Sequence, residues 1–226
     1  MNTLIHAIFL LIGTTIGAGI FVLPYVFSRS GLLPSAIGLV FLGLVILCVN
    51  YFYSQVILDT SGDRQLPGYV KKYFGEAASK VALVVMLVSL YGALIAYCSL
   101  AGEFLHMIFD FGSVSLFIII FIHVGMLFFL KGIKVLAKIQ SWLVCVMILL
   151  LLVVPLVLLR SVDVNNFTMV GKLPLFFWGS TFFSLTGFSV IPEMEEVLRN
   201  KKGLLVPAIV IGSIVPVILY AGFAFG

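Results

Sequence analysis

The sequence predicts an all-α protein that crosses a membrane seven times. Of its 226 residues, 62% are hydrophobic and only 10% carry a charge, against about 25% charged residues in soluble domains. Seven runs without Asp, Glu, Lys or Arg are each at least 20 residues long, which is the length that a bilayer-spanning helix needs. These runs are residues 1–28, 30–58, 81–102, 111–130, 139–159, 173–192 and 203–226. The composition excludes a soluble enzyme, a disordered chain, a secreted disulfide scaffold and an outer-membrane barrel.

The loops between these runs predict the orientation in the membrane. With seven spans, ten of the 13 Lys and Arg residues fall on one side, in the loops at 59–80, 131–138 and 199–202, and three fall on the other. Because Lys and Arg gather on the cytoplasmic side, we expect a multi-pass protein of the cell membrane with its N-terminus in the cytoplasm. The basic excess is then a topology signal rather than a nucleic-acid site. The loop at 59–80 predicts a short interfacial helix, and no linker divides the chain, so residues 1–226 are expected to form a single transmembrane domain.

Five of the runs have the composition of ordinary spanning helices, whereas the first and the sixth contain helix breakers. The first holds three glycines within residues 13–19, followed by Pro24, and the sixth holds Gly187 within residues 184–189, followed by Pro192. Glycine and proline are the poorest helix formers, so both helices are expected to unwind near the middle of the membrane. The alternative is that these glycines only allow close helix packing.

An unwound helix offers a binding site made of backbone. Freed amides and carbonyls in a membrane must be satisfied by protein, water or ligand. A half-helix beginning near Gly19 would present N–H groups and a positive dipole end, which suit a carboxylate, whereas the preceding carbonyls suit an ammonium or another cation. A free amino acid carries both groups.

The two breaks also resemble each other in sequence. Residues 19–24, Gly-Ile-Phe-Val-Leu-Pro, align with residues 187–192, Gly-Phe-Ser-Val-Ile-Pro, and Gly-Leu-Leu follows each at Gly31 and Gly203. The two copies lie five spans apart, and because five is odd they must have opposite orientations in the membrane. This is the inverted repeat typical of secondary transporters.

These segments resemble a known family. The sequence GTTIGAGIFVLPYVFSRSGLL resembles the first span of the amino acid–polyamine–organocation superfamily, and residues 91–105 and 187–220 are similar to its amino acid/auxin permease branch. The resemblance implies a LeuT-type fold of two inverted five-helix repeats with helices 1 and 6 broken. The first repeat, about 3–160, would be complete, and the second, beginning at about 173–226, incomplete. The chain would then be a fragment of a ten-to-twelve-span protein, or else a genuine seven-span protein.

The resemblance also implies a substrate site. It assigns the substrate carboxylate to the amides of two residues, the ammonium to two carbonyls, and the substrate side chain to a pocket that a third-span tyrosine completes. The residues are Ala18 and Gly19 for the carboxylate, Thr15 and Ile16 for the ammonium, Gly17 between these two pairs, Phe183, Thr186 and Gly187 for the pocket, and Tyr91 or Tyr97 from the third span. Such a pocket favours a neutral or aromatic amino acid.

Acidic residues near the span ends are the remaining candidates. Glu103 is expected at the outer interface, or alternatively at a gate or proton site. Glu193 lies deeper on the sixth span and is a candidate for an inner gate or proton site, the alternative being no such role. Glu195 and Glu196 are expected to reach water or to pair with Arg199. We expect no metal and no cofactor, and a coupling ion, H⁺ or Na⁺, is left open. The oligomeric state is not predicted.

The leading functional hypothesis is a secondary active transporter that moves amino acids by alternating access. A seven-span receptor or sensor is the alternative, although residues 203–226 lack the lysine that a retinal protein needs. A non-transporting membrane interaction protein is a further alternative. An enzyme is not expected, since the chain has no HExxH pair, no nucleophile motif and no paired intramembrane aspartates.

Overall fold

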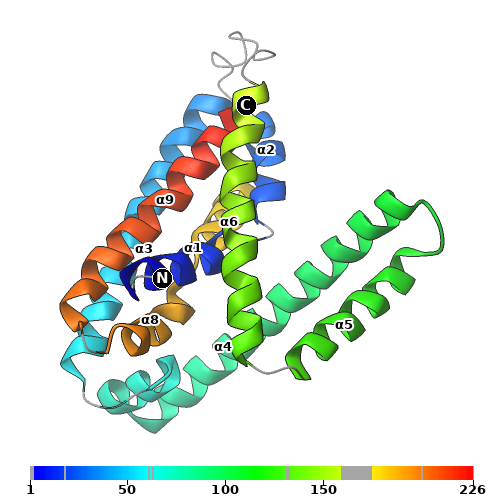
Figure 1. The fold of residues 1–226 in the computed structure, drawn as a ribbon. Helices are drawn as coiled ribbons and strands as arrows, with labels where there is room; N and C mark the ends of the chain where they lie inside the picture. The colour runs from blue at the N-terminus through cyan, green and yellow to red at the C-terminus, as the bar shows by residue number, and fades with distance from the viewer. Residues whose placement is uncertain are drawn as a thin grey trace. The chain divides into compact units, whose positions relative to one another are not determined.

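The computed structural model describes residues 3–17, 19–60, 62, 64–130, 133–158, 175–199 and 201–225. Within these ranges every regular element is a helix, and no strand occurs. The α-helices are α1 (Thr3–Thr15), α2 (Gly19–Ser30), α3 (Leu32–Asp59), α4 (Leu66–Phe109), α5 (Val114–Leu130), α6 (Ile133–Leu158), α7 (Leu175–Leu185), α8 (Ile191–Val197) and α9 (Leu205–Phe225) (Figure 1). Two short 3₁₀ turns, η3 (Phe188–Val190) and η4 (Lys202–Leu204), precede α8 and α9.

Most of these helices are apolar and long. In the described part of the chain, four stretches are long and apolar enough to cross a membrane, namely 32–59, 66–109, 175–197 and 202–223. The bent pair α1 and α2 makes a fifth when counted as one span. The all-helical membrane class is therefore confirmed, whereas the predicted number of seven spans is not.

The two remaining apolar runs form shorter helices. Helix α5 has 17 residues. The first residues of its charge-free run lie in a turn instead, where Asp110 and Gly112 adopt positive φ, at 51° and 74°. In α6 the apolar part covers residues 142–155. Both runs are thus helical, as expected. Their apolar stretches within the described residues, 114–130 and 142–155, are shorter than the roughly 20 residues that a span needs, although α6 as a whole has 26 residues.

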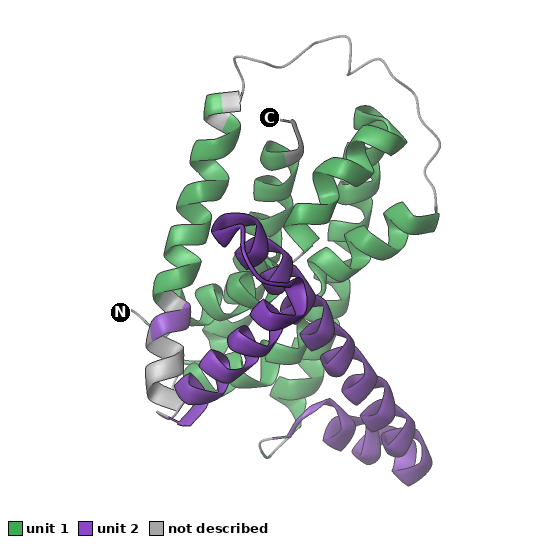
Figure 2. Cartoon of the chain, turned by 90° about the vertical axis from the view of Figure 1, so that its right-hand side faces the viewer, with its two compact units in different colours: residues 1–63, 141–226 green, residues 64–140 purple. Residues whose placement is uncertain are grey.

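The chain divides into two compact units (Figure 2). Unit 1 comprises residues 1–63 and 141–226, and unit 2 comprises residues 64–140. Unit 1 contains both helix breaks that the sequence marks. That residues 1–226 act as a single domain stays a prediction.

Unit 2 is built from the long helix α4 and its neighbour α5. Gly75 interrupts α4 with φ 85° and ψ −177°, a conformation that only glycine adopts readily. The segment before it folds back, so that Ser79 Oγ donates a hydrogen bond of 2.8 Å to the Pro67 carbonyl. A helical segment therefore does lie within the loop at 59–80, and its interfacial position stays a prediction.

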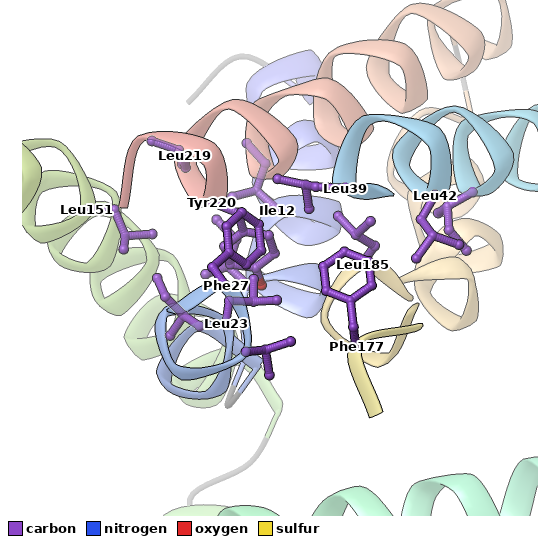
Figure 3. Close-up of a cluster of buried hydrophobic side chains, with 14 of the residues drawn as sticks. Ile12, Leu23, Phe27, Leu39, Leu42, Leu151, Phe177, Leu185, Leu219 and Tyr220 are labelled. Carbon is purple, nitrogen blue, oxygen red and sulfur yellow. The ribbon is translucent and has the colours of Figure 1, made fainter. Parts of the chain in front are cut away.

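The core of unit 1 joins helices that are far apart in sequence. Leu23 and Phe27 of α2, Phe177 of α7 and Tyr220 of α9 are at most 2% exposed, and Figure 3 shows them within one cluster. The cluster also draws side chains from three more helices: Ile12 of α1, Leu39 and Leu42 of α3, and Leu151 of α6. This apolar packing holds the two broken helices against each other.

Candidate functional site

The first break lies between α1 and α2. Helix α1 ends at Thr15, α2 begins at Gly19, and their axes differ by 55°. The Ile16 amide still donates to the Ile12 carbonyl at 2.8 Å, but the Gly17 amide donates to the Thr15 carbonyl, only two residues back, at 3.1 Å. The helical hydrogen-bond pattern therefore ends at Gly17, within the segment that the sequence marks. Ala18 lies outside the described residues, so the predicted role of its amide stays a prediction.

The second break lies between α7 and α8. Helix α7 ends at Leu185, and Gly187 has the non-helical angles φ −137° and ψ 12° before the η3 turn begins. The Thr186 amide donates three residues back, to the Phe183 carbonyl, at 3.3 Å. This break also falls where the glycine and proline pattern predicts it.

A hydroxyl group bonds back to the helix before each break. Thr14 Oγ1 donates to the Leu10 carbonyl, Ser184 Oγ donates to the Ser180 carbonyl at 2.7 Å, and Thr186 Oγ1 donates to the Phe182 carbonyl at 2.7 Å. Such bonds compete for the carbonyls of the last helical turn and favour bending. The sequence around each break therefore contributes hydroxyls as well as glycines to the unwinding.

The two breaks pack directly against each other. A Cβ atom at Gly19 would overlap Ser184, lying 2.5 Å from its Cβ and 2.8 Å from its backbone Cα. A Cβ atom at Gly187 would overlap the Thr15 hydroxyl and lie 3.0 Å from Leu11 Cδ1. Each break thus has a glycine at the point where it meets the opposite broken helix.

A tyrosine from α9 joins the two breaks. The Tyr220 hydroxyl lies 3.0 Å from the Thr15 carbonyl and 3.0 Å from the Ser184 carbonyl, and it donates to both. Tyr220 is fully buried at 0% exposure, and Thr15 and Ser184 are 5% and 1% exposed. Sequence reasoning missed this residue. The available signal was a tyrosine in the charge-free run 203–226, because a buried tyrosine hydroxyl requires a partner.

Further polar groups surround the site. Thr181 of α7 is completely buried, and its hydroxyl has no hydrogen-bond partner within the described chain. Asn50 of α3 donates from Nδ2 to Ser213 Oγ of α9 at 3.2 Å, and both residues are buried. This bond connects α3 to the helix that carries Tyr220.

No group of three His, Cys, Asp or Glu side chains that could hold a metal occurs in the described ranges.

The predicted pocket residues have different surroundings. Gly187 is buried at the second break, Thr186 is partly buried, and Phe183 is 44% exposed. Tyr91 and Tyr97 lie on α4, which belongs to unit 2, and are 63% and 39% exposed. The structure thus brings together Thr15, Gly19 and Gly187, and the contribution of the α4 tyrosines stays a prediction.

The acidic candidates lie on the surface of the described chain. Glu103 of α4 and Glu193 of α8 are both exposed. Their roles at a gate or proton site stay predictions.

The expected surroundings of Glu195 are corrected by the structure. Instead of reaching water or pairing with Arg199, Glu195 is 8% exposed and forms an ion pair with Lys202, with 2.6 Å between Nζ and Oε1. The reason is that α8 ends at Val197, so Arg199 lies beyond the helix and loses the i+4 geometry. The η4 turn brings Lys202 into reach. Glu196 is exposed, as expected.

Known proteins resemble the chain over nearly all of its length. Residues 1–225 match the model of the tryptophan/tyrosine permease family. A tyrosine-specific transport system of Haemophilus influenzae is 26% identical over 97% of this chain and 56% of its own length. Glutamine transporter 2 of Aliivibrio fischeri is 26% identical over 93% of the chain and 57% of its own length.

A third relative is similar over a shorter part of the chain. Neutral amino acid transporter 9 of Rattus norvegicus is 32% identical over 54% of the chain and 22% of its own length. The chain spans little more than half the length of the two bacterial relatives, and no solved structure matches it. Since the family model covers residues 1–225, the chain belongs to the tryptophan/tyrosine permease family.

Proposed function

We propose that the chain is the substrate-binding part of a secondary active transporter for neutral or aromatic amino acids. The observation that carries the proposal is the contact between two broken helices, Gly19 against Ser184 and Gly187 against Thr15. Membership of the tryptophan/tyrosine permease family supports it, as do the relatives named as transporters of tyrosine and glutamine. No covalent chemistry is needed, and the protein is proposed not to be an enzyme.

The backbone at the breaks supplies the complementary charges for an amino acid. The N-terminus of α2 at Gly19 directs amide hydrogens and the positive end of its dipole toward the break, where they would bind the carboxylate. The C-termini of α1 and α7 present carbonyl oxygens, which suit an ammonium. Because the Thr15 carbonyl is already held by Tyr220, we assign the ammonium to the Ile16 carbonyl.

The contacts between the breaks support an inverted repeat of the LeuT type. In the alignment of the two copies Gly187 takes the place of Gly19, and Ser184 takes the place of Ile16, next to Thr15. Gly19 meets Ser184 while Gly187 meets Thr15, so the contacts are reciprocal to within one residue. Reciprocal contacts are what a two-fold relation between equivalent units produces. We therefore propose seven spans, with the first repeat complete and the second incomplete.

Alternating access then follows from differential binding. A substrate shifts the balance between inward-open and outward-open states only by the difference in its affinity for the two. The half-exposed Phe183 and the Thr186 side chain would set the selectivity for the substrate side chain. The transporter would be coupled to H⁺ or Na⁺, with Glu103 and Glu193 as candidate gate or proton groups.

The proposed orientation has its own test. Seven spans with a cytoplasmic N-terminus place Gln65 inside the cell and Ser113 outside, and Gln65 and Ser113 are both exposed. In a variant without Cys48, Cys98 and Cys145, we expect an impermeant maleimide to label Ser113→Cys in whole cells. Gln65→Cys should react only after the cells are opened. Labelling in the opposite pattern would invert the topology.

Uptake into proteoliposomes tests the function. The protein is expressed from its full open reading frame, purified and reconstituted into proteoliposomes. Uptake of radiolabelled tyrosine, tryptophan and glutamine is then measured with and without a proton or sodium gradient. Gly19→Leu should abolish uptake because its side chain fills the space in front of the α2 amides. The matched control is Gly179→Leu on α7, where a Cβ atom meets nothing within 4 Å. Uptake by Gly19→Leu at the wild-type rate would refute the backbone site.

A further inference from the structure

Two helix ends meet at the breaks, and each presents a carbonyl oxygen to the apolar core of unit 1. Thr15 is the last residue of α1, and Ser184 is next to last in α7. Neither carbonyl receives the amide four residues further along, because the helix has ended, although the Thr15 carbonyl accepts the Gly17 amide at 3.1 Å. Each carbonyl lies at the negative end of its helix dipole. Two such ends side by side in an apolar core are unfavourable unless a donor lies between them.

The Tyr220 hydroxyl is that donor. It lies at the same distance, 3.0 Å, from the Thr15 and Ser184 oxygens, so its one proton is shared between two acceptors. Its ring belongs to the apolar cluster of unit 1, which also contains Phe27 and Leu219 (Figure 3). Tyr220 and the two residues whose carbonyls it binds, Thr15 and Ser184, are all buried. The ring is therefore fixed by packing, while the hydroxyl determines how far apart the two carbonyls lie.

We propose that Tyr220 is a positioning residue that ties the two broken helices together and aligns their backbone groups for the substrate. The inference rests on the proposed function. The hydroxyl does not need to touch the substrate. By holding the ends of α1 and α7 at a fixed separation, it keeps the Ile16 carbonyl and the α2 amides in register before binding, which lowers the cost of ordering them.

A matched set of substitutions at position 220 tests this role. Tyr220→Phe keeps the ring and removes the donor, whereas p-aminophenylalanine, introduced by an amber codon, keeps the ring and restores N–H donors at the same place. Tyr25→Phe on α2 is the control, because Tyr25 is 57% exposed. We expect Tyr220→Phe to raise the KM of uptake about tenfold or more, since it removes a buried donor from the Ser184 carbonyl and leaves the Thr15 carbonyl with only the Gly17 amide. The p-aminophenylalanine variant and Tyr25→Phe should keep the wild-type KM.

A distance measurement provides a second readout that does not depend on transport. Spin labels at Ile5 of α1 and Phe176 of α7, which are 42% and 55% exposed, report the separation of the two broken helices. We expect the distance distribution to broaden or shift in Tyr220→Phe and to return to the wild-type distribution with p-aminophenylalanine.

The outcomes separate the inference from the proposed function. Equal behaviour of the Phe and p-aminophenylalanine variants, in KM and in distance, overturns the role of Tyr220. Loss of folding in the Phe variant with recovery by p-aminophenylalanine supports it, because the two side chains differ only in the amino group. If the wild-type protein transports no amino acid, the proposed function fails, while the distance measurement still decides whether Tyr220 ties the breaks.

Discussion

The contact between Gly19 and Ser184 leads to a specific prediction for Gly19→Ala. The added methyl group would lie 2.5 Å from Ser184 Cβ and 2.8 Å from its Cα. Because the Cα is a backbone atom, rotation of the serine side chain cannot relieve the overlap, and α2 and α7 must move apart. That movement would disturb the packing of Phe27 against Phe177, whose ring centroids are 6.1 Å apart.

The size of the effect follows from the cost of overpacking. Extra methyl groups in a packed core cost about 1–3 kcal/mol, and a backbone overlap places Gly19→Ala near about 3 kcal/mol. For a chain of this size each kcal/mol shifts the melting temperature by about 2–4 °C, so we expect a decrease of about 6–12 °C. Gly179→Ala, where the methyl group meets nothing, should change stability by at most about 1 kcal/mol and in the stabilising direction.

Tryptophan fluorescence of the purified protein in detergent measures both variants. Trp178 is a suitable reporter because it packs edge-on against Phe177 at 5.4 Å. Adding Ser184→Gly to Gly19→Ala removes the serine Cβ and Oγ, and should recover about 1–2 kcal/mol, a coupling energy typical of residues in contact. Equal melting temperatures for Gly19→Ala and Gly179→Ala, or no recovery in the double variant, would refute the packing of α2 on α7.

Two further predictions concern the second break and the end of α8. Gly187→Ala should destabilise the protein by about 1–3 kcal/mol, because its Cβ meets the Thr15 hydroxyl; thermal melts should show recovery when Thr15→Ala is added, and its absence would contradict the contact. Lys202→Gln leaves the buried Glu195 carboxylate without its partner at 2.6 Å. Since the lysine is half-exposed, we expect the free energy of unfolding to fall by about 1–3 kcal/mol, measured by thermal melts at low salt. The neighbouring Lys201→Gln should lower it by at most about 0.5 kcal/mol. Equal losses for the two variants would count against the ion pair.

Features set by local sequence could be predicted well. The positions of both breaks followed from glycine and proline near residues 13–24 and 184–192, because backbone propensity acts within a few residues. Among the described residues, helices also formed within all seven charge-free runs. The number of seven spans stays a prediction, since absence of charge does not show where a turn begins: Asp110 and Gly112 form a turn at the start of one run.

Features that depend on distant residues could not be predicted. The Tyr220 contacts join residues 205 and 36 positions apart in sequence. A tyrosine in a charge-free run indicates a hydroxyl that needs a partner, but nothing local identifies that partner. The expectation that Glu195 would pair with Arg199 assumed a helix continuing past Val197. The partner of Glu195 is instead Lys202, which the turn after α8 brings close to it. The sequence does not show the direction of that turn.

The close packing at Gly19 has a consequence for interpreting transport data. A glycine is required there by Ser184 whether or not a substrate binds, so loss of uptake in Gly19→Leu can result from displaced helices alone. The variant pair Gly19→Ala and Gly19→Ala/Ser184→Gly separates the two causes, because the second substitution removes the overlap with the serine Cβ and Oγ and recovers part of the packing, but leaves the methyl group beside the α2 amides. Recovery of stability without recovery of uptake assigns those amides to the substrate, whereas recovery of both assigns Gly19 to packing only.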